Sequence, residues 1–185
     1  MVHCFFEQSG VFRDEFEKLG YAALDYDISN NNKTDIIIDL FEQIDNAYYG
    51  KKSIFDDIVK DDLILAFFPC TYFSSNNQLL FSGRSNSFKT WDIKQKLHYC
   101  INRHTLLNEF YIKLCRFVCV ILDRNLKCII ENPHNNYLDN YFPLPPTFID
   151  YDRTARGDHY EKPTNYYFII LSRNLMLYLS LFIVL

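Results

Sequence analysis

Glycine and excess positive charge are both scarce in this sequence. The chain has 185 residues but only five glycines, so it cannot form the glycine-rich phosphate loop of P-loop nucleotide hydrolases. Its 23 acidic residues outnumber its 19 lysines and arginines, which gives a formal charge of −4. A generally basic nucleic-acid coat protein is therefore excluded, and any contact with nucleic acid has to be local.

The sequence also lacks Cys-x-x-Cys motifs, the usual spacing of metal-binding or redox-active cysteines. The chain has six cysteines without a Cys-x-x-Cys pair, and the closest two, Cys115 and Cys119, lie in an apolar stretch. A zinc site needs four ligands on a compact frame, so we expect core thiols and no bound metal. Because no basic and then apolar leader precedes them, the expected location is the cytoplasm, where thiols stay reduced.

Apolar residues are plentiful, and their spacing predicts the fold. The hydrophobic share of 49% suits one domain with a full core. Short apolar runs predict strands over residues 2–6, 21–24, 35–39, 63–68 and 127–130. Helical spacing of apolar residues predicts helices over 11–19 and 97–124. This alternation favours an α/β fold with a mostly parallel, doubly wound sheet covered on both faces.

Two segments lack the alternating strand and helix patterns of the rest of the chain. Residues 74–90 are polar and aperiodic, and prolines after Pro133 predict extended loops with at most one edge hairpin. The apolar run 166–185 has three interpretations: a strand over 166–171 followed by a short helix, a membrane span, or a tail that arose by frame change or truncation. Arg173 and Asn174 disfavour the span. We therefore predict an α/β domain over 1–170 and an apolar tail over 171–185.

Three chemically distinctive segments follow predicted strands. They are Gln8-Ser9-Gly10, Pro69-Cys70 and Glu131-Asn132-Pro133. Each has an ordinary explanation: a turn glycine, a small buried thiol and an exposed loop acid, respectively. Open α/β sheets, however, bind ligands at the carboxyl ends of their strands. The coincidence of all three segments at that edge predicts a binding or catalytic site.

Together these segments resemble the cytosine-C5 DNA methyltransferases, most closely the short phage-type members. Pro69-Cys70-Thr71 matches the family's Pro-Cys step, and residues 129–133 match its Glu-Asn motif. Residues 4–10 are similar to its cofactor loop, and the likeness extends over residues 3–168. The resemblance implies a Rossmann-like fold of the class I S-adenosylmethionine-dependent methyltransferases.

The resemblance also implies roles for individual residues. Cys70 would be the nucleophile, Glu131 would hold the cytosine, and Asn132 would fix the loop. The residues implied for binding of the cofactor S-adenosylmethionine are Phe6, Ser9, Gly10, Asp25, Asp39 and Pro69. Cytosine C5 becomes nucleophilic only after a thiolate adds at C6, so a nearby cation or helix N-terminus is expected to lower the pKa of Cys70.

DNA is the partner that the resemblance implies, with weak or local contact. The basic residues nearest the predicted site are Arg84, Lys89, Lys94 and Lys96. Further along the chain, Arg153 and Arg156 lie in the region of the family's arginine element. The target base has to be flipped out of a duplex or presented in a single strand.

The sequence also supports a second interpretation, a catalytically inactive methyltransferase-like binding protein of phage or mobile-element origin. Gln8 replaces the first glycine of the cofactor loop, and no target-recognition domain follows Pro133. A different enzyme on a doubly wound sheet, or a membrane-tethered protein, is the remaining interpretation.

Overall fold

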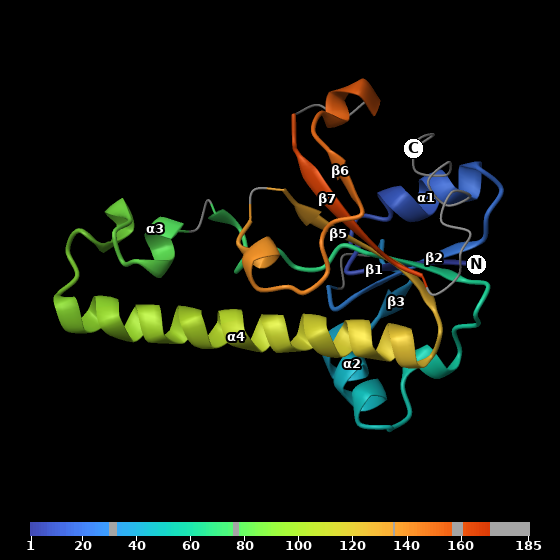
Figure 1. The fold of residues 1–185 in the computed structure, drawn as a ribbon, viewed down its shortest axis with the longest axis horizontal. Helices are drawn as coiled ribbons and strands as arrows, with labels where there is room; N and C mark the ends of the chain where they lie inside the picture. The colour runs from blue at the N-terminus through green and yellow to red at the C-terminus, as the bar shows by residue number, and fades with distance from the viewer. Residues whose placement is uncertain (30–32, 76–77, 135, 157–160, 171–185) are drawn as a thin grey trace.

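The computed structural model describes residues 1–29, 33–75, 78–134, 136–156 and 161–170. These residues form an α/β fold around a mixed, mostly parallel seven-stranded sheet (Figure 1). The strands, in their order across the sheet, are β3 (Ile36–Ile37), β2 (Ala23–Asp27), β1 (Val2–Phe5), β4 (Leu63–Ala66), β5 (Lys127–Pro133), β7 (Thr164–Ile169) and β6 (Phe148–Asp150). The predicted α/β class and mostly parallel sheet are confirmed.

Helices cover both faces of the sheet because its central strands are apolar on both sides. Along β4, Ile64 and Ala66 face one core and Leu63 and Leu65 face the other. Helix α1 (Val11–Lys18) buries Phe16 on the second face. Helices α2 (Leu40–Tyr48) and α4 (Ile93–Asp123) cover the first face. This is the two-sided covering that continuous apolar strands predict.

Helix α2 was not predicted, and the strand expected over residues 35–39 is shortened to two residues. Asp39 explains both differences, because its carboxylate accepts hydrogen bonds from the amides of Phe41 and Glu42 and so caps the helix. The strand therefore ends before Asp39. Leu40, Ile44 and Ala47 are the buried face of α2, at helical spacing.

Other boundaries are displaced from their predicted positions. Strand β2 runs over Ala23–Asp27, so Asp25 lies within the strand rather than after it. Helix α4 begins at Ile93, before the predicted residue 97, because Asp92 and Gln95 form a capping box. Strand β5 continues to Pro133 because its last residues pair with the antiparallel strand β7.

The C-terminal part of the described chain is the predicted edge hairpin. Strands β6 and β7 pair antiparallel, and Tyr166–Ile169 of β7 confirm the start of the expected strand. The apolar tail over 171–185 lies outside the described residues. No helix within the described ranges is both long and apolar enough to cross a membrane.

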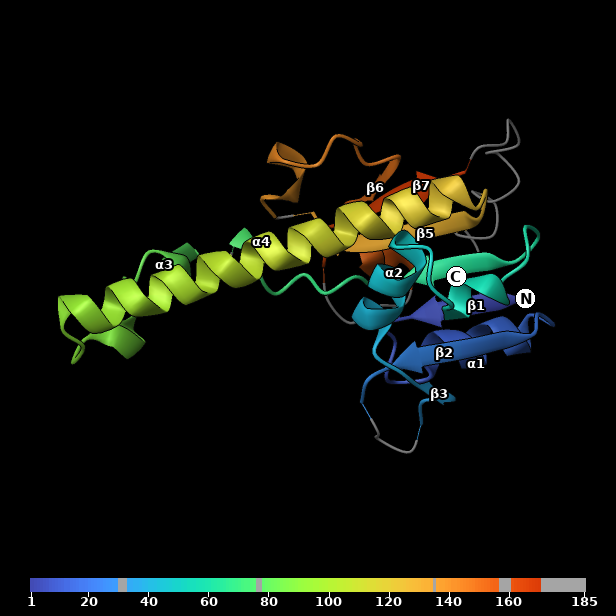
Figure 2. The same ribbon diagram turned by 90° about the horizontal axis from the view of Figure 1, so that it is seen from below.

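Within its described residues, the polar, aperiodic stretch 74–90 includes the short helix α3 (Gln78–Phe81) and the 3₁₀ turn η3 (Asn86–Phe88). Both lie beside the N-terminal part of α4, which extends far beyond the sheet (Figures 1 and 2). The buried residues of α4 begin only at Leu114. The long helix therefore has one half in the core and one half outside it.

Candidate functional site

The carboxyl ends of four parallel strands place most of the predicted site residues along one edge of the sheet. Phe6 and Gly10 follow β1, Asp25 lies in β2, Cys70 follows β4, and Glu131 lies near the end of β5. Strand β1 is central, with β2 on one side and β4 on the other. Parallel pairing thus brings together segments that are far apart in the sequence.

Asn132 ties two of these segments together. It is fully buried, and its Nδ2 donates a hydrogen bond of 3.1 Å to the backbone oxygen of Phe68. Phe68 precedes the Pro69-Cys70 step, so this bond holds the start of the loop after β4 against β5. Asn132 thus connects β5 to the loop that carries Cys70.

Replacement of Asn132 by alanine should destabilise the protein by about 2 kcal/mol, because the oxygen of Phe68 would be left buried without its donor. Urea unfolding measures the loss of free energy of unfolding. Asn140→Ala is the control, since Asn140 is exposed. Equal losses in the two variants would contradict the proposed anchoring of the loop.

Cys70 is half-buried in the loop after β4. Burial raises the pKa of its thiol, the charge of Glu131 raises it further, and Lys162 acts in the opposite direction. The expectation of a lowered pKa is therefore wrong, because desolvation of the thiolate outweighs the nearby cation. The backbone oxygen of Cys70 accepts hydrogen bonds from the amides of Phe73 and Ser74, which close the loop into a turn.

Glu131 is buried, with 8% of its surface exposed. Burial raises the pKa of its carboxyl, and Lys162 and Arg153 partly oppose the rise. The Nη1 atom of Arg153 lies 3.7 Å from Oε1 of Glu131. One of the two late arginines of the sequence therefore reaches the site, while the side chain of Arg156 lies outside the described residues.

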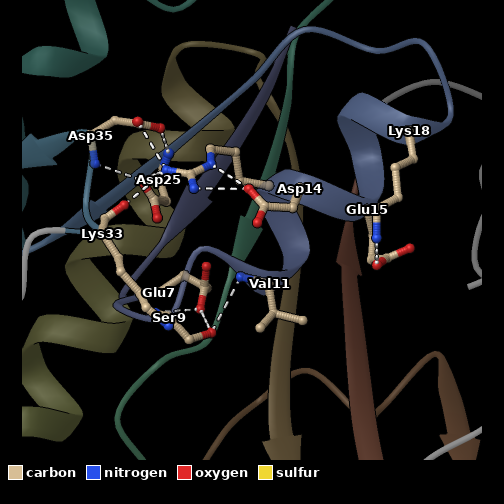
Figure 3. Close-up of polar contacts among 10 residues, drawn as sticks. Glu7, Ser9, Val11, Asp14, Glu15, Lys18, Asp25, Lys33 and Asp35 are labelled. Atoms are coloured by element: carbon tan, nitrogen blue, oxygen red, sulfur yellow. Dashed lines mark hydrogen bonds and ion pairs between the residues drawn. The ribbon is translucent and has the colours of Figure 1, made fainter.

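Three carboxylates converge on the guanidinium of Arg13 near the ends of β1 and β2 (Figure 3). Arg13 donates hydrogen bonds of 3.3 Å to Asp25 and 2.9 Å to Asp35. The backbone amide of Asp35 donates a 2.7 Å bond to Oδ1 of Asp25. Sequence reasoning missed both Arg13 and Asp35, because their pairing depends on how α1 and the β2–β3 connection pack.

The pKa values of Asp25 and Asp35 are shifted in opposite directions. Asp25 is fully buried, and burial raises its pKa, with the neighbouring carboxylate of Asp35 adding to the rise. Burial also acts to raise the pKa of Asp35, but hydrogen bonds from Asp25 and Arg13 outweigh it and hold that pKa below the ordinary value. Asp25 is therefore the member of the pair that more readily keeps a proton.

Gly10 is a position where the backbone requires glycine. Its φ is +73°, and a Cβ there would lie 2.7 Å from Nη2 of Arg13. The loop before it is held by Glu7, whose Oε1 accepts bonds from the amide and hydroxyl of Ser9. Gln8 between them is exposed. The predicted cofactor loop is thus ordered around Glu7 and Arg13.

The remaining predicted cofactor residues lie beside an aromatic cluster. The ring of Phe6 lies 5.3 Å from that of Phe41 and 5.4 Å from that of Phe68, measured between centroids. Pro69 follows this cluster directly. Asp39 is exposed and caps α2, so at least one of its oxygens is engaged by the backbone.

Among the residues that the structure describes, four buried oxygens at this edge have no hydrogen-bond partner. They are Oε2 of Glu7, Oδ2 of Asp25, Oε1 of Glu131 and Oδ1 of Asn132. A buried polar atom without a partner costs about 1–3 kcal/mol, so such atoms are rare in folded proteins. The amide oxygen and any ionised carboxylate among them accept hydrogen bonds from N–H or O–H donors. The described residues contain no cluster of three side chains suited to a metal ion.

Comparison with known proteins adds no family assignment. No family model matches the chain, and no curated protein is significantly similar to it. The fold and the site define an α/β protein with an acceptor-rich edge at the carboxyl ends of its parallel strands.

Proposed function

We propose that the protein is an S-adenosylmethionine-dependent methyltransferase-like protein that acts on C5 of cytosine in DNA. The observation that carries the proposal is the placement of Cys70 and Glu131 at the ends of the adjacent parallel strands β4 and β5, with buried oxygens of Glu7 and Asp25 that have no hydrogen-bond partner at the same edge of the sheet. The sheet supports it, because the order β3-β2-β1-β4-β5 is that of nucleotide-binding doubly wound sheets. The Rossmann-like class I methyltransferase fold is therefore the architecture we propose.

The residues at the edge suit S-adenosylmethionine. This cofactor presents ribose hydroxyls, an ammonium group and an adenine amino group, all of which donate hydrogen bonds. Oδ2 of Asp25 and Oε2 of Glu7 are acceptors without partners beside the Gly10 loop, so we assign them the hydroxyls and the ammonium group. When bound, the cofactor supplies an electrophilic methyl group.

Cys70 and Glu131 supply the chemistry on the base. The thiolate of Cys70 adds to C6 of cytosine, forming a C–S bond and converting C5 into a nucleophile. Once C5 carries the methyl group, loss of the C5 proton to water breaks the C–S bond, restores the C5–C6 double bond and frees Cys70. Glu131 is assigned the N3 and exocyclic amino edge of the base, and burial, which raises the pKa of its carboxyl, favours the protonated form that donates to N3. Asn132 holds the Cys70 loop in place through Phe68.

Detection of 5-methylcytosine tests this function. Purified protein is incubated with S-adenosylmethionine and cytosine-containing DNA, single-stranded or duplex, and the nucleosides are analysed by mass spectrometry. Product formation supports the enzyme. Cofactor binding without product supports the inactive methyltransferase-like protein, which the raised pKa of Cys70 and the presence of Gln8 favour.

The raised pKa of Glu131 predicts a pH dependence of stability. An acid whose pKa is higher in the folded than in the unfolded state contributes stability below its unfolded pKa and loses it as the pH rises through its folded pKa. Glu131→Gln should therefore become more stable relative to wild type as the pH is raised from about 4, near the ordinary glutamate pKa, towards about 8. Melting temperatures across this range measure the difference, with exposed Glu161→Gln as control. A pH-independent difference for Glu131→Gln would contradict the predicted linkage.

A further inference from the structure

The N-terminal half of α4 forms an arm with α3 and η3, which we define as residues 78–106 (Figures 1 and 2). The first residues of α4 that pack against the core are Leu107 and Phe110. Residues 93–106 therefore extend about 21 Å beyond the packed half of the helix, at 1.5 Å per residue. This length of helix needs a reason other than the stability of the core.

The arm is basic although the whole chain is acidic. It carries a single acid, Asp92, whose carboxylate is used to cap α4. Its cations are Arg84, Lys89, Lys94, Lys96 and Arg103. Within the described residues none of these five forms an ion pair, whereas Arg13, Arg116 and Arg124 of the sheet domain each bind a carboxylate. Arg103 is set apart from the other four, because its guanidinium lies over the rings of Tyr72 and Phe81 and its Nε and Nη2 atoms are buried. The charges of the other four cations are available to an external anion.

Apolar side chains are exposed among these cations. Trp91, Ile93, Leu97 and Ile101 are exposed by 37%, 72%, 56% and 64%. Leu97 and Ile101 line a shallow hollow of about 530 Å³ along α4. A surface that alternates cations with apolar and aromatic groups is typical of sites for single-stranded nucleic acids, where phosphates meet the cations and bases meet the apolar groups.

The arm is connected to the proposed nucleophile loop. Tyr72 lies two residues after Cys70, and the guanidinium of Arg103 lies 4.8 Å from the centroid of its ring. The ring of Tyr72 also lies 4.7 Å from that of Phe110, where α4 enters the core. A strand bound along the arm therefore approaches the Cys70 loop.

We propose that the arm binds single-stranded nucleic acid and presents its bases to the site. Single strands are favoured over duplex because a duplex stacks its bases against one another, away from Trp91 and the neighbouring aliphatic side chains. A single strand also avoids the unpairing cost of a few kcal/mol that a flipped base requires. Delivery of cytosine to Cys70 rests on the proposed function, but binding by the arm does not.

The chain has a built-in probe for this binding, because Trp91 is its only tryptophan. Titration of the full chain with a single-stranded oligodeoxynucleotide of about 20 nucleotides, long enough for one or more binding sites, should quench the emission of Trp91. The matching duplex should quench it less and bind more weakly. Equal quenching and affinity for the two would overturn the preference for single strands.

Charge variants test the contacts with phosphate. One triple variant removes three exposed cations of the arm: Arg84→Gln, Lys89→Gln, Lys94→Gln. A second, the domain variant, removes three exposed cations outside the arm: Lys51→Gln, Lys52→Gln, Lys60→Gln. The arm variant should bind the single strand at least about tenfold more weakly, and its logarithmic salt dependence should be shallower by about 2, at about 0.7 per lost contact. The domain variant should match wild type.

Equal weakening in both triple variants, or in neither, would overturn the proposal. So would self-association of the arm that blocks DNA binding, detected by analytical ultracentrifugation as a concentration-dependent dimer lost in Leu97→Glu. Failure of the proposed function is distinguishable, because it would abolish cofactor binding and methyl transfer without changing the quenching of Trp91. The two claims therefore stand or fall separately.

Discussion

Cys70→Ser is expected to lower the rate of cytosine methylation on the order of a thousandfold or more. A serine hydroxyl has nearly the shape of the thiol but ionises far less readily and is a poorer nucleophile at C6. Cys70 lies in a loop fixed by the bond from Asn132 to Phe68, so the substitution leaves the surrounding contacts in place. The rate of 5-methylcytosine formation measures the loss.

Two measurements separate loss of the nucleophile from loss of the fold. The far-ultraviolet circular dichroism and the affinity for S-adenosylmethionine should be the same in Cys70→Ser and wild type. Cys115→Ser is the matched control, since Cys115 is also a half-buried thiol but lies in the core-packed half of α4, away from the arm. Methylation by Cys70→Ser at a wild-type rate would exclude Cys70 as the nucleophile.

Arg13→Ala is expected to lower the free energy of unfolding by about 3 kcal/mol, because it leaves a buried carboxylate without its cation. Arg13 bridges the carboxylates of Asp25 and Asp35 and also donates a 2.8 Å bond to the backbone oxygen of Lys33. Without the guanidinium, Asp25 and Asp35 repel each other. The substitution should therefore also weaken binding of S-adenosylmethionine beside Asp25.

The loss in Arg13→Ala should depend on pH in a defined direction. Removal of the cation raises the pKa values of the two carboxyls in the folded state, so the variant recovers stability as the pH falls and they take up protons. Urea unfolding at pH 7 and near pH 4, close to the ordinary aspartate pKa, measures the recovery. Lys18→Ala is the control, because Lys18 pairs only with Glu15 among the described residues, on the exposed face of α1. Equal destabilisation by both variants would contradict the structural role of Arg13.

The sequence predicts the strands and helices well where apolar residues alone define them. Strands β1 and β4 and helix α1 lie within one or two residues of their predicted bounds. The boundaries that differ depend on polar side chains, since Asp39 starts α2 and Asp92 starts α4. Strand β5 is longer than predicted because its end pairs with β7, a contact that local sequence does not encode.

Only some residues of the candidate site can be predicted from the sequence. Cys70 and Glu131 are found from short motifs, because those motifs stand next to predicted strands. Asp35 and Arg13 are not, since their role appears only when the β2–β3 connection folds against α1. The direction of the pKa shift of Cys70 is also set by burial, which depends on segments far along the chain.

Titration calorimetry with S-adenosylmethionine tests the central claim most directly, because methyl transfer at this edge requires that cofactor. We predict micromolar binding to the wild-type protein and a dissociation constant at least about tenfold higher for Asp25→Asn, which loses a charged acceptor. Exposed Asp61→Asn should bind like wild type. Absence of binding at millimolar cofactor, by protein shown to be folded, would contradict the assignment of this edge as the cofactor site.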